Sequence, residues 1–371
     1  MELYGKILNL VNGQGEFLPV VLQKYRPGDE EGMIACIRDE YGESYFKREL
    51  YNGEYVEEKA REGGCTFLVA KTLSGEIAGM MMLKPVYPKE NMCELASQIL
   101  RKKYRGYGLA LPFLEYAMEI LLEGAYDAAY CLPVAFHDIS QRLVYGLGLR
   151  ATGFLLNVFD MEKISHSYER GRNTKHSQGI QMKAVKKKNA KTLYVPKEHQ
   201  AFCRAVYGRL GVRYRLAGER KEDGKKQSGK MLEKMPETSL VSYKNDDIQK
   251  SLEITIDRVG RDLENRLVEI YEKYPLTGRQ TANVLLNCHD RYSVCAYRLL
   301  EDRGWFFAGL KPLWGEREFL IMHHKGDVEI YFEDYVVSRE FKPILEYVKK
   351  CCEERKGGGL WQERKSESAK E

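Results

Sequence analysis

The segment KKYRGYGLALPF, which starts at Lys102, holds the residues of this sequence best suited to bind an anion. Two lysines and Arg105 supply positive charge, and Gly106 and Gly108 let the backbone approach a ligand without an obstructing side chain. The segment lies between a predicted strand, MCELASQIL, and a predicted helix, LALPFLEYAMEILLE. A helix N-terminus presents unpaired amide groups and the positive end of the helix dipole, so we expect phosphate oxygens to bind here.

Other glycine motifs fit this segment poorly. No GK[ST] follows it and it contains no GxGxxG, which excludes a Walker loop and a dinucleotide fingerprint. The letters GLGLRA at Gly146 meet a looser form of the second motif, but there a predicted helix precedes a strand, the reverse of the required order. A simple tight turn between strand and helix remains the alternative for the segment itself.

The elements around the segment indicate a mixed α/β domain. Apolar runs and turn residues predict six strands and four helices before residue 160. The strands are expected near 20–25, 66–72, 76–83, 92–100, 127–133 and 152–159, and the helices near 29–40, 54–62, 109–124 and 140–147.

Composition favours an ordinary globular protein with two domains. The 371 residues carry 59 basic and 54 acidic side chains, a balance that argues against a dedicated nucleic-acid or membrane binder. No signal peptide or membrane-spanning run is visible, so we expect a cytoplasmic protein. The nine cysteines are scattered without a CxxC pair, which predicts buried thiols rather than disulfides or a metal site.

The second half of the sequence repeats a pattern found in the first half. HDISQRLVYGLGL, from His137, aligns with SVCAYRLLEDRGW, from Ser293, and the alignment continues until Gly153 falls opposite Gly309. This repeat predicts two related domains. The expected boundaries are a first domain at 1–160, a linker at 161–178, a second domain at 179–354 with a charged loop near 215–236, and a disordered tail at 355–371.

The glycine segment resembles the pyrophosphate-binding loop of the GNAT superfamily of acyl-CoA N-acyltransferases, whose pattern [QR]xxGx[GA] is met by Arg105, Gly108 and Ala110. The order of elements up to Phe159 is similar too. YGESYFKRELY, SQRLVYGLGLRATGFLL and GWFFAGLKP resemble a bacterial group of GNAT proteins with a GNAT-like second half. The resemblance implies a GNAT fold with a twisted mixed sheet, a second GNAT-like domain, and acetyl-CoA bound by Arg105, Gly106, Tyr107, Gly108, Leu109 and Ala110.

The resemblance also implies a catalytic apparatus. Glu94 stands where family members often have a glutamate that relays the amine's proton, although an exposed charge is the alternative. The usual tyrosine acid falls at Val144, so the neighbouring Tyr145 is a weaker candidate that could instead pack. His137 replaces a frequent asparagine and could contact pantetheine or act as an acid, or could simply cap a helix.

Aromatic residues suggest where the acceptor binds. Tyr41 and Tyr45 fall in the elbow between the first two helices, which often overlies the acceptor site in GNAT folds, although helix packing is the alternative. The expected function is N-acylation of an unidentified small or protein amine, without a metal. The alternative is a CoA-binding sensor. Because Ser293 and Leu300 replace the asparagine and tyrosine positions and no glycine loop precedes Thr281, we expect no CoA site in the second half.

Overall fold

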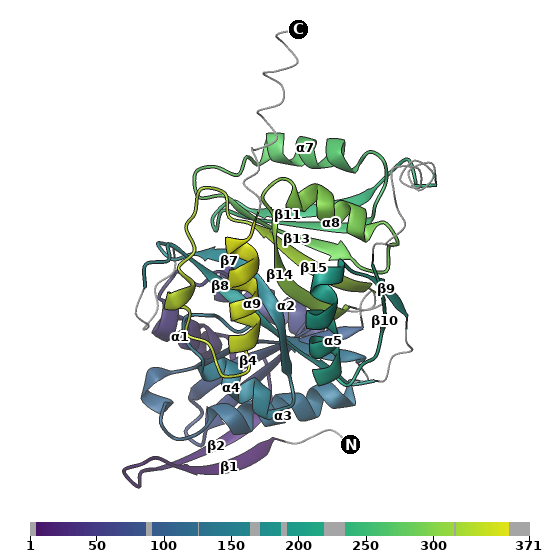
Figure 1. Cartoon of the computed structure of the whole chain (residues 1–371). Helices are drawn as coiled ribbons and strands as arrows, with labels where there is room; N and C mark the ends of the chain where they lie inside the picture. The colour runs from purple at the N-terminus through teal and green to yellow at the C-terminus, as the bar shows by residue number, and fades with distance from the viewer. Residues whose placement is uncertain are drawn as a thin grey trace.

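The computed structural model describes residues 5–86, 91–124, 126–163, 171–186, 191–218, 234–314 and 317–355. The first half of the chain alternates between strands and helices (Figure 1). Its elements are β1 (Lys6–Val11), β2 (Phe17–Lys24), α1 (Glu30–Tyr41), η1 (Arg48–Tyr51), α2 (Gly53–Arg61), β3 (Thr66–Thr72), β4 (Ile77–Val86), β5 (Met92–Leu100), η2 (Lys102–Tyr104), α3 (Ala110–Glu123), β6 (Ala128–Cys131), α4 (Ile139–Gly146), β7 (Arg150–Asp160) and β8 (Lys175–Ala184).

The second half begins with a short helical region and then repeats the strand and helix order of β4 to β8. Its elements are β9 (Thr192–Tyr194), η3 (Lys197–His199), α5 (Gln200–Arg209), β10 (Arg215–Ala217), β11 (Leu240–Asp246), β12 (Ser251–Arg258), α7 (Leu263–Lys273), β13 (Thr281–Asn287), α8 (Ser293–Glu301), β14 (Phe306–Trp314), β15 (Arg317–His324), η4 (Phe332–Asp334) and α9 (Lys342–Glu353).

One mixed sheet runs through both halves. Within the described residues its order is β1-β2-β3-β4-β5-β6-β8-β7-β14-β15-β13-β12-β11, and β9 pairs with β10 separately. Within the large sheet, the pairs β5–β6 and β12–β13 are parallel and all other neighbouring strands are antiparallel. In Figure 1 the hairpin β1–β2 lies at the bottom and α7 at the top, at opposite ends of this sheet.

Two apolar cores sandwich the first strands of the sheet. On one face, Leu68, Leu83 and Leu95 pack against α3 through residues such as Phe113. On the other face, a second set of strand residues packs beneath α1 and α2, with Met33, Ile37 and Val56 from the helices and Phe67, Met82, Ala96 and Ile99 from the strands. Because β4 is covered on both faces, its sequence IAGMMML is a nearly continuous apolar run.

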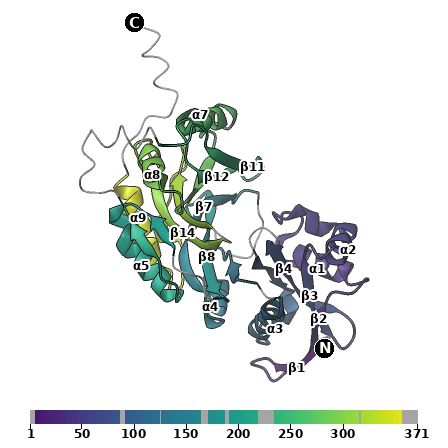
Figure 2. The same ribbon diagram turned by 90° about the vertical axis from the view of Figure 1, so that its right-hand side faces the viewer.

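The two halves meet where β7 pairs with β14 (Figure 2). Gly153 pairs with Gly309, the residue opposite which the sequence repeat placed it. A Cβ atom at Gly153 would lie 2.6 Å from the Leu310 nitrogen and 2.9 Å from the Gly309 Cα. Only glycine therefore allows the two backbones to approach so closely.

The pairing irregularities of the two halves are repeated as well. The β7–β8 register shifts between Ala151 and Gly153, and the β14–β15 register shifts between Phe307 and Gly309. Further along the same strands, Asn157 and Leu313 have positive φ angles of 52° and 58°. The spacing that separates Gly153 from Gly309 also separates Asn157 from Leu313, so the two hairpins are bent at matching points.

Most elements of the first half lie where the sequence predicted them, and the differences are local. Strand β1 was not predicted, and β2 begins at Phe17 rather than near residue 20. The expected linker at 161–178 ends earlier than predicted, because Lys175 already begins β8, which lies between β6 and β7. Residues 164–170, 219–233 and 356–371, which include most of the predicted charged loop and tail, lie outside the described residues.

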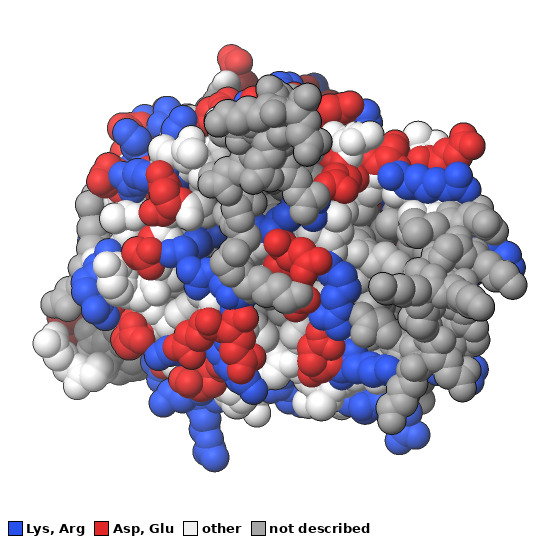
Figure 3. Space-filling view, turned by 45° about the horizontal axis from the view of Figure 1, so that its top comes forward, with Lys and Arg blue, Asp and Glu red and all other residues white. Residues whose placement is uncertain are grey.

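The surface shows no field of one sign on the face seen in Figure 3, where basic and acidic side chains alternate. This mixture agrees with the near balance of 59 basic and 54 acidic residues.

Candidate functional site

The loop between β5 and α3 has the exposed backbone that the sequence predicted. Gly106 and Gly108 have φ angles of 86° and 76°, and a Cβ atom added to either would meet nothing within 4 Å. Across the described residues, no hydrogen-bond acceptor is recorded for the backbone amides from Gly106 to Leu111. The side chain of Gln98 donates to the Ala110 carbonyl at 2.7 Å and so fixes the first turn of α3 to β5. The loop therefore offers a row of available donors at a helix N-terminus.

A cavity of about 560 Å³ opens beside this loop. It lies between the end of β5, the glycine loop and the first turns of α4. Its wall contains both polar and apolar groups, which suits a long ligand with an anionic end. The lining residues are Glu40, Tyr41, Gln98, Ile99, Leu100, Tyr104, Arg105, Gly106, Gly108, Leu109, Ala110, His137, Ile139, Ser140 and Leu143.

Two basic side chains of the loop, those of Arg105 and Lys103, are already engaged by carboxylates. Arg105 forms an ion pair with the buried Glu40, and its guanidinium also donates to the Leu100 carbonyl at 3.2 Å. Lys103 and the neighbouring Arg101 both pair with Glu76. These ion pairs hold the loop against α1 and the start of β4, so the backbone amides are the donors that remain most available to an anion.

Tyr107 and Leu109, the remaining residues of the predicted loop, have different surroundings. The Tyr107 hydroxyl donates to Glu16 at 3.0 Å, which ties the loop to the β1–β2 hairpin. Leu109 is 1% exposed and packs in the core beneath α3. Both side chains therefore support the loop. Leu109 also borders the cavity together with the two glycines and Ala110, whereas Tyr107 does not.

Glu94 lies in the middle of β5, beside the point where β5 and β6 stop pairing. The last residue pair of this parallel ladder is Glu94 with Tyr130, and the Tyr130 hydroxyl donates to the Glu94 carboxylate at 3.2 Å. Burial, followed by the nearby carboxylate, raises the pKa of Tyr130 well above its usual value, so this tyrosine stays protonated as a donor. Glu94 itself is half-buried.

The alternation of a regular strand fails at one residue of β5. Strict alternation would place Met92, Glu94, Ala96 and Gln98 on one face, but the β4–β5 register shifts between Met80 and Met82. Ser97 occupies the shift with a φ of 51°. Ala96 and Ile99 consequently share the core beneath α1, and Gln98 turns to α3. Sequence reasoning missed Ser97 because nothing in its residue type marks a bulge.

The elbow between α1 and η1 contributes an aromatic cluster. The ring centroids of Tyr41 and Tyr45 are 4.7 Å apart, and those of Phe46 and Phe159 are also 4.7 Å apart. The Tyr45 hydroxyl donates to the Ser97 side chain at 3.0 Å. Tyr41 lines the cavity, whereas Tyr45 is 4% exposed and belongs to the core. The two predicted acceptor residues thus come together but occupy different environments.

His137 lines the cavity from the loop that joins β6 to α4. This loop is held by the buried Gln141, whose side-chain nitrogen donates to the carbonyls of Val134 and His137 at 2.9 and 3.0 Å. The Gln141 oxygen accepts from the Ser338 backbone nitrogen at 2.8 Å. A segment of the second half therefore fixes the backbone that carries His137. Sequence analysis gave no sign of this contact.

Tyr145 lies away from the cavity. Its side chain is 47% exposed, and the Arg150 guanidinium lies 4.4 Å from its ring centroid. Ile139, Ser140 and Leu143 form the face of α4 toward the cavity. This position gives no support to an acid role for Tyr145, and Val144 is buried at 1% exposure.

The counterpart of the glycine loop in the second half joins β12 to α7 and is short. Its backbone amides donate hydrogen bonds to other parts of the protein. The Val259 amide donates to the Asp290 carboxylate at 2.5 Å, and the Gly260 amide donates to the Ser239 hydroxyl at 2.9 Å. Arg261 donates to the Pro236 carbonyl at 2.9 Å. A Cβ atom at Gly260 would lie within 2.5 Å of the backbone around Ser239, so no ligand-sized space separates the two segments.

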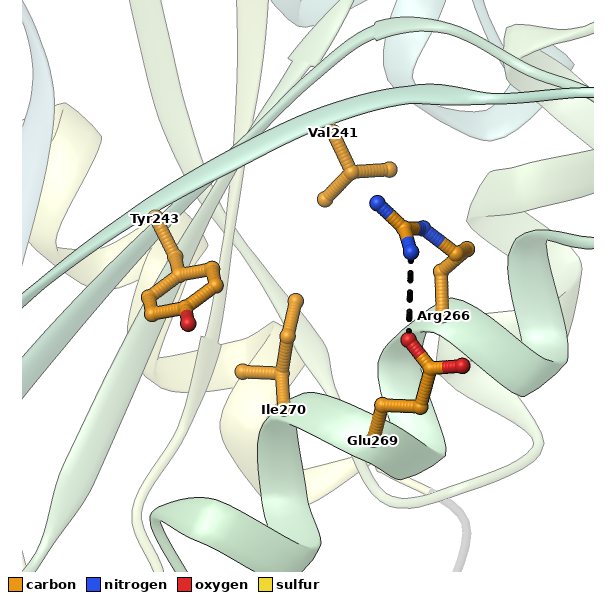
Figure 4. A pocket seen from close by; sticks show the side chains of 5 residues that line it. All are labelled: Val241, Tyr243, Arg266, Glu269 and Ile270. Atoms are coloured by element: carbon orange, nitrogen blue, oxygen red, sulfur yellow. Dashed lines mark hydrogen bonds and ion pairs between the residues drawn. The ribbon is translucent and has the colours of Figure 1, made fainter.

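A second, smaller cavity of about 160 Å³ lies between β11 and α7 (Figure 4). It is lined by Val241, Tyr243, Arg266, Glu269 and Ile270. Arg266 and Glu269 form an ion pair of 3.2 Å across one side, so their charges compensate each other. Its size and lining do not suggest a catalytic site.

Two further classes of site were searched in the described parts of the chain. No group of three or more histidine, cysteine, aspartate or glutamate side chains there is placed to hold a metal ion. No helix there has the length and apolar character needed to cross a membrane.

Comparison with known proteins identifies the first half. Residues 33–144 match the model of the Acetyltransferase (GNAT) family. No curated protein matches the chain. Among solved structures, an acetyltransferase from Salmonella typhimurium with acetyl-CoA is 13% identical, with a TM-score of 0.37, and the match covers 46% of this chain and 96% of that one.

Two other solved structures have similar values. A spermidine N-acetyltransferase chimera from Vibrio cholerae is 15% identical with a TM-score of 0.36, covering 45% of this chain and 96% of that one. A ribosomal-protein-S5-alanine acetyltransferase from Vibrio fischeri is 9% identical with a TM-score of 0.36, covering 45% and 93%. We draw no conclusion about substrate from these likenesses. The family match, together with the mixed sheet and the glycine loop that it spans, identifies residues 33–144 as a GNAT acetyltransferase domain.

Proposed function

We propose that the protein is an acetyl-CoA-dependent N-acetyltransferase that acts on an amine. The observation that carries this proposal is the row of available amides from Gly106 to Leu111 beside a cavity of about 560 Å³. Such a row at a helix N-terminus suits the pyrophosphate of coenzyme A. The β5 residues that line this cavity are Gln98, Ile99 and Leu100. Glu94 lies four residues before Gln98 on the same strand, and we propose that the pantetheine arm and the acyl group extend from the loop in its direction.

The chemistry follows from the groups around the end of this path. The amine nitrogen attacks the thioester carbonyl carbon, a C–N bond forms, the C–S bond breaks, and the thiolate leaves with the bonding pair. Glu94 accepts the proton that the amine must lose, directly or through a water molecule. Tyr130, which donates to Glu94 at 3.2 Å, orients the carboxylate. His137 borders the cavity, and we assign it to contact pantetheine or to return a proton to the thiolate.

We further propose that the second half is a GNAT-like domain that does not bind coenzyme A. The repeated register shifts and the Gly153–Gly309 pair support a common origin of the two halves. The occupied amides at Gly260 and Arg261 support the loss of the CoA site. Through Ser338 and Gln141, this half instead positions the loop of His137.

A second candidate function is that of a CoA-binding sensor without turnover. The observation that favours it is the exposed position of Tyr145, because no tyrosine of α4 reaches the cavity to protonate a thiolate. Isothermal titration with CoA, combined with release of free thiol from acetyl-CoA over a panel of amines, distinguishes the two. Binding with turnover supports the enzyme. Saturable binding without turnover of any amine supports the sensor, and absence of binding contradicts both.

A further inference from the structure

A row of polar side chains crosses three strands beside the end of the proposed pantetheine path. Lys84 of β4 is the register partner of Glu94 in β5, and Glu94 is the register partner of Tyr130 in β6. Register partners project from the same face of a sheet. Met82 and Ala96, the previous pair on that face, belong to the apolar core beneath α1 and α2. The polar row therefore borders this core, on the face that the α1–η1 elbow approaches.

The elbow brings a second lysine to this row. The Lys47 ammonium donates to the Ser97 hydroxyl at 3.1 Å, beside the Tyr45 hydroxyl that reaches the same oxygen at 3.0 Å. It also lies 5.7 Å from the ring centroid of Phe46. Because Tyr45 is buried, the Ser97 contact holds the half-buried Lys47 at the register shift within β5 rather than in open solvent.

Neither Lys47 nor Glu94 has an ion-pair partner among the residues that the structure describes. Both charges nevertheless lie near the Cys131 thiol. Burial and, after it, the Glu94 carboxylate raise the pKa of this thiol to about 12, while the Lys47 ammonium opposes the shift. Lys47, held at Ser97, and Lys84, the register partner of Glu94, are thus two positive charges beside one carboxylate on this part of the sheet.

We propose that the acceptor is a free amino acid, whose carboxylate binds Lys47 while its amino group faces Glu94. This inference rests on the proposed acetyltransferase function and names the acceptor class of that site. Two opposite charges that lack ion-pair partners in the protein are satisfied by a molecule that carries both opposite charges. A polyamine would place further positive charge beside Lys47 and Lys84 and would be disfavoured. The half-buried ring of Phe46, which packs on the buried Tyr45, offers an apolar surface beside the carboxylate site.

The test compares each of the common L-amino acids with its α-amide, which keeps the amine and removes the carboxylate charge. We expect at least one amino acid to be acetylated with a kcat/KM about tenfold or more above that of its amide, the scale of one well-placed charge pair. Equal or better acetylation of the amides across the panel, or a preference for spermidine, would overturn the amino-acid assignment while leaving the acetyltransferase function intact.

Variants then test the role of Lys47. Lys47→Met should raise KM for the preferred amino acid by about tenfold and leave the rate with its amide nearly unchanged, because only the acid uses this ammonium. A purely structural role would instead affect both acceptors equally, and that result contradicts the proposal. Lys59→Met is the matched control, since Lys59 lies on α2 in an ion pair with Glu62 at 2.9 Å.

A binding measurement keeps the test independent of turnover. In the presence of saturating CoA, the preferred amino acid should raise the Tm of the full chain, and its amide should raise it less. If CoA binds and the amino acid raises Tm although no amine is acetylated, the acceptor class stands and the catalytic function fails. If CoA binds and no amino acid raises Tm above its amide, the acceptor class is wrong.

Discussion

The two strand-to-helix loops of this chain lie in halves that share an order of strands and helices, yet they reach opposite states. In the first half, the amides from Gly106 to Leu111 face a cavity and have no described acceptor. In the second half, the corresponding amides at Val259, Gly260 and Arg261 each donate to another part of the protein. The side chains of Asp290 and Ser239 there supply the oxygen atoms that a phosphate would otherwise supply.

The difference shows two ways in which a helix N-terminus of the same fold can find acceptors for its amides. A helix N-terminus needs acceptors for its first amides, whether they come from a ligand, from water or from the protein. When the segment around Ser239 supplies them, the helix is stabilised permanently and the ligand has no place. The open loop of the first half lacks this internal stabilisation, so ligand binding should stabilise it.

The largest expected effect comes from closing the open loop. Gly108→Glu should reduce CoA affinity by more than about 100-fold, because the new side chain enters the ligand's space and its charge repels phosphate. Isothermal titration should give one CoA per chain for the native protein and none for the variant, since the second half offers no substitute site. Two sites per native chain would contradict the comparison of the loops.

A matched control separates this effect from backbone strain. Gly63 has a φ of 71° and nothing within 4 Å of an added Cβ, like Gly108 with its φ of 76°. Gly63→Glu therefore introduces the same strain and charge at a position away from the loop and should leave CoA affinity unchanged.

The next effect concerns Glu94, whose counterpart in the β12–β13 ladder is Ile256. Glu94→Gln should preserve CoA affinity and lower kcat by about 100-fold, the usual scale for loss of a positioned general base. The deficit should shrink as pH rises, because more of the amine is then already neutral. A pH–rate profile of the variant that coincides with that of the native enzyme would eliminate the base assignment.

A smaller effect is expected at the joint between the halves. Lys175 is fully buried, and its ammonium donates to the Lys250 carbonyl at 2.6 Å and to the Thr281 hydroxyl at 2.8 Å. Burial lowers its pKa from 10.5 to about 7. Between these values the unfolded chain binds more protons, so this group makes the free energy of unfolding rise with pH, by up to about 1.4 kcal/mol per pH unit.

Denaturant unfolding at several pH values between 7 and 9.5 measures this slope. Lys175→Met should flatten it, whereas Lys59→Met, which changes a lysine on the surface of α2, should not. An equal slope in the native protein and the Lys175→Met variant would show that the lysine keeps an ordinary pKa.

The smallest effect is expected at Tyr145. Its exposed ring stacks on Arg150, so Tyr145→Phe removes only a hydroxyl that points away from the cavity. We expect kcat to change by less than about twofold. A loss near that of Glu94→Gln would return Tyr145 to the role of acid and require α4 to move.

The sequence predicted the parts of this molecule that depend on local patterns. Strands β3 and β5 begin and end at the predicted residues. The repeat aligned Gly153 with Gly309, but the alignment did not predict that the two residues pair in the sheet. Alternation, apolar runs and turn glycines are local signals, because each is found within the same few residues as the strand, helix or turn that it predicts. Strand β1 was not predicted, because it is a short edge strand with three exposed positions and no flanking apolar run.

The position of the glycine loop could be predicted from the sequence. The partners of the charged side chains around it could not. The pairing of Arg105 with Glu40 joins residues far apart in sequence, and no spacing rule reveals it. The bulge at Ser97 and the arrival of Lys47 depend on how α1 packs on the sheet. Long-range contacts of this kind decide which charges remain for a ligand, and they are set only when the chain is folded.

The close contact of Gly153 with Gly309 also constrains how the chain can fold during synthesis. Until β14 has left the ribosome, β7 presents an open sheet edge, which is a template for aggregation. The first half therefore cannot complete its sheet while the nascent chain is short. Ribosome-bound intermediates that end before β14 should depend on chaperones.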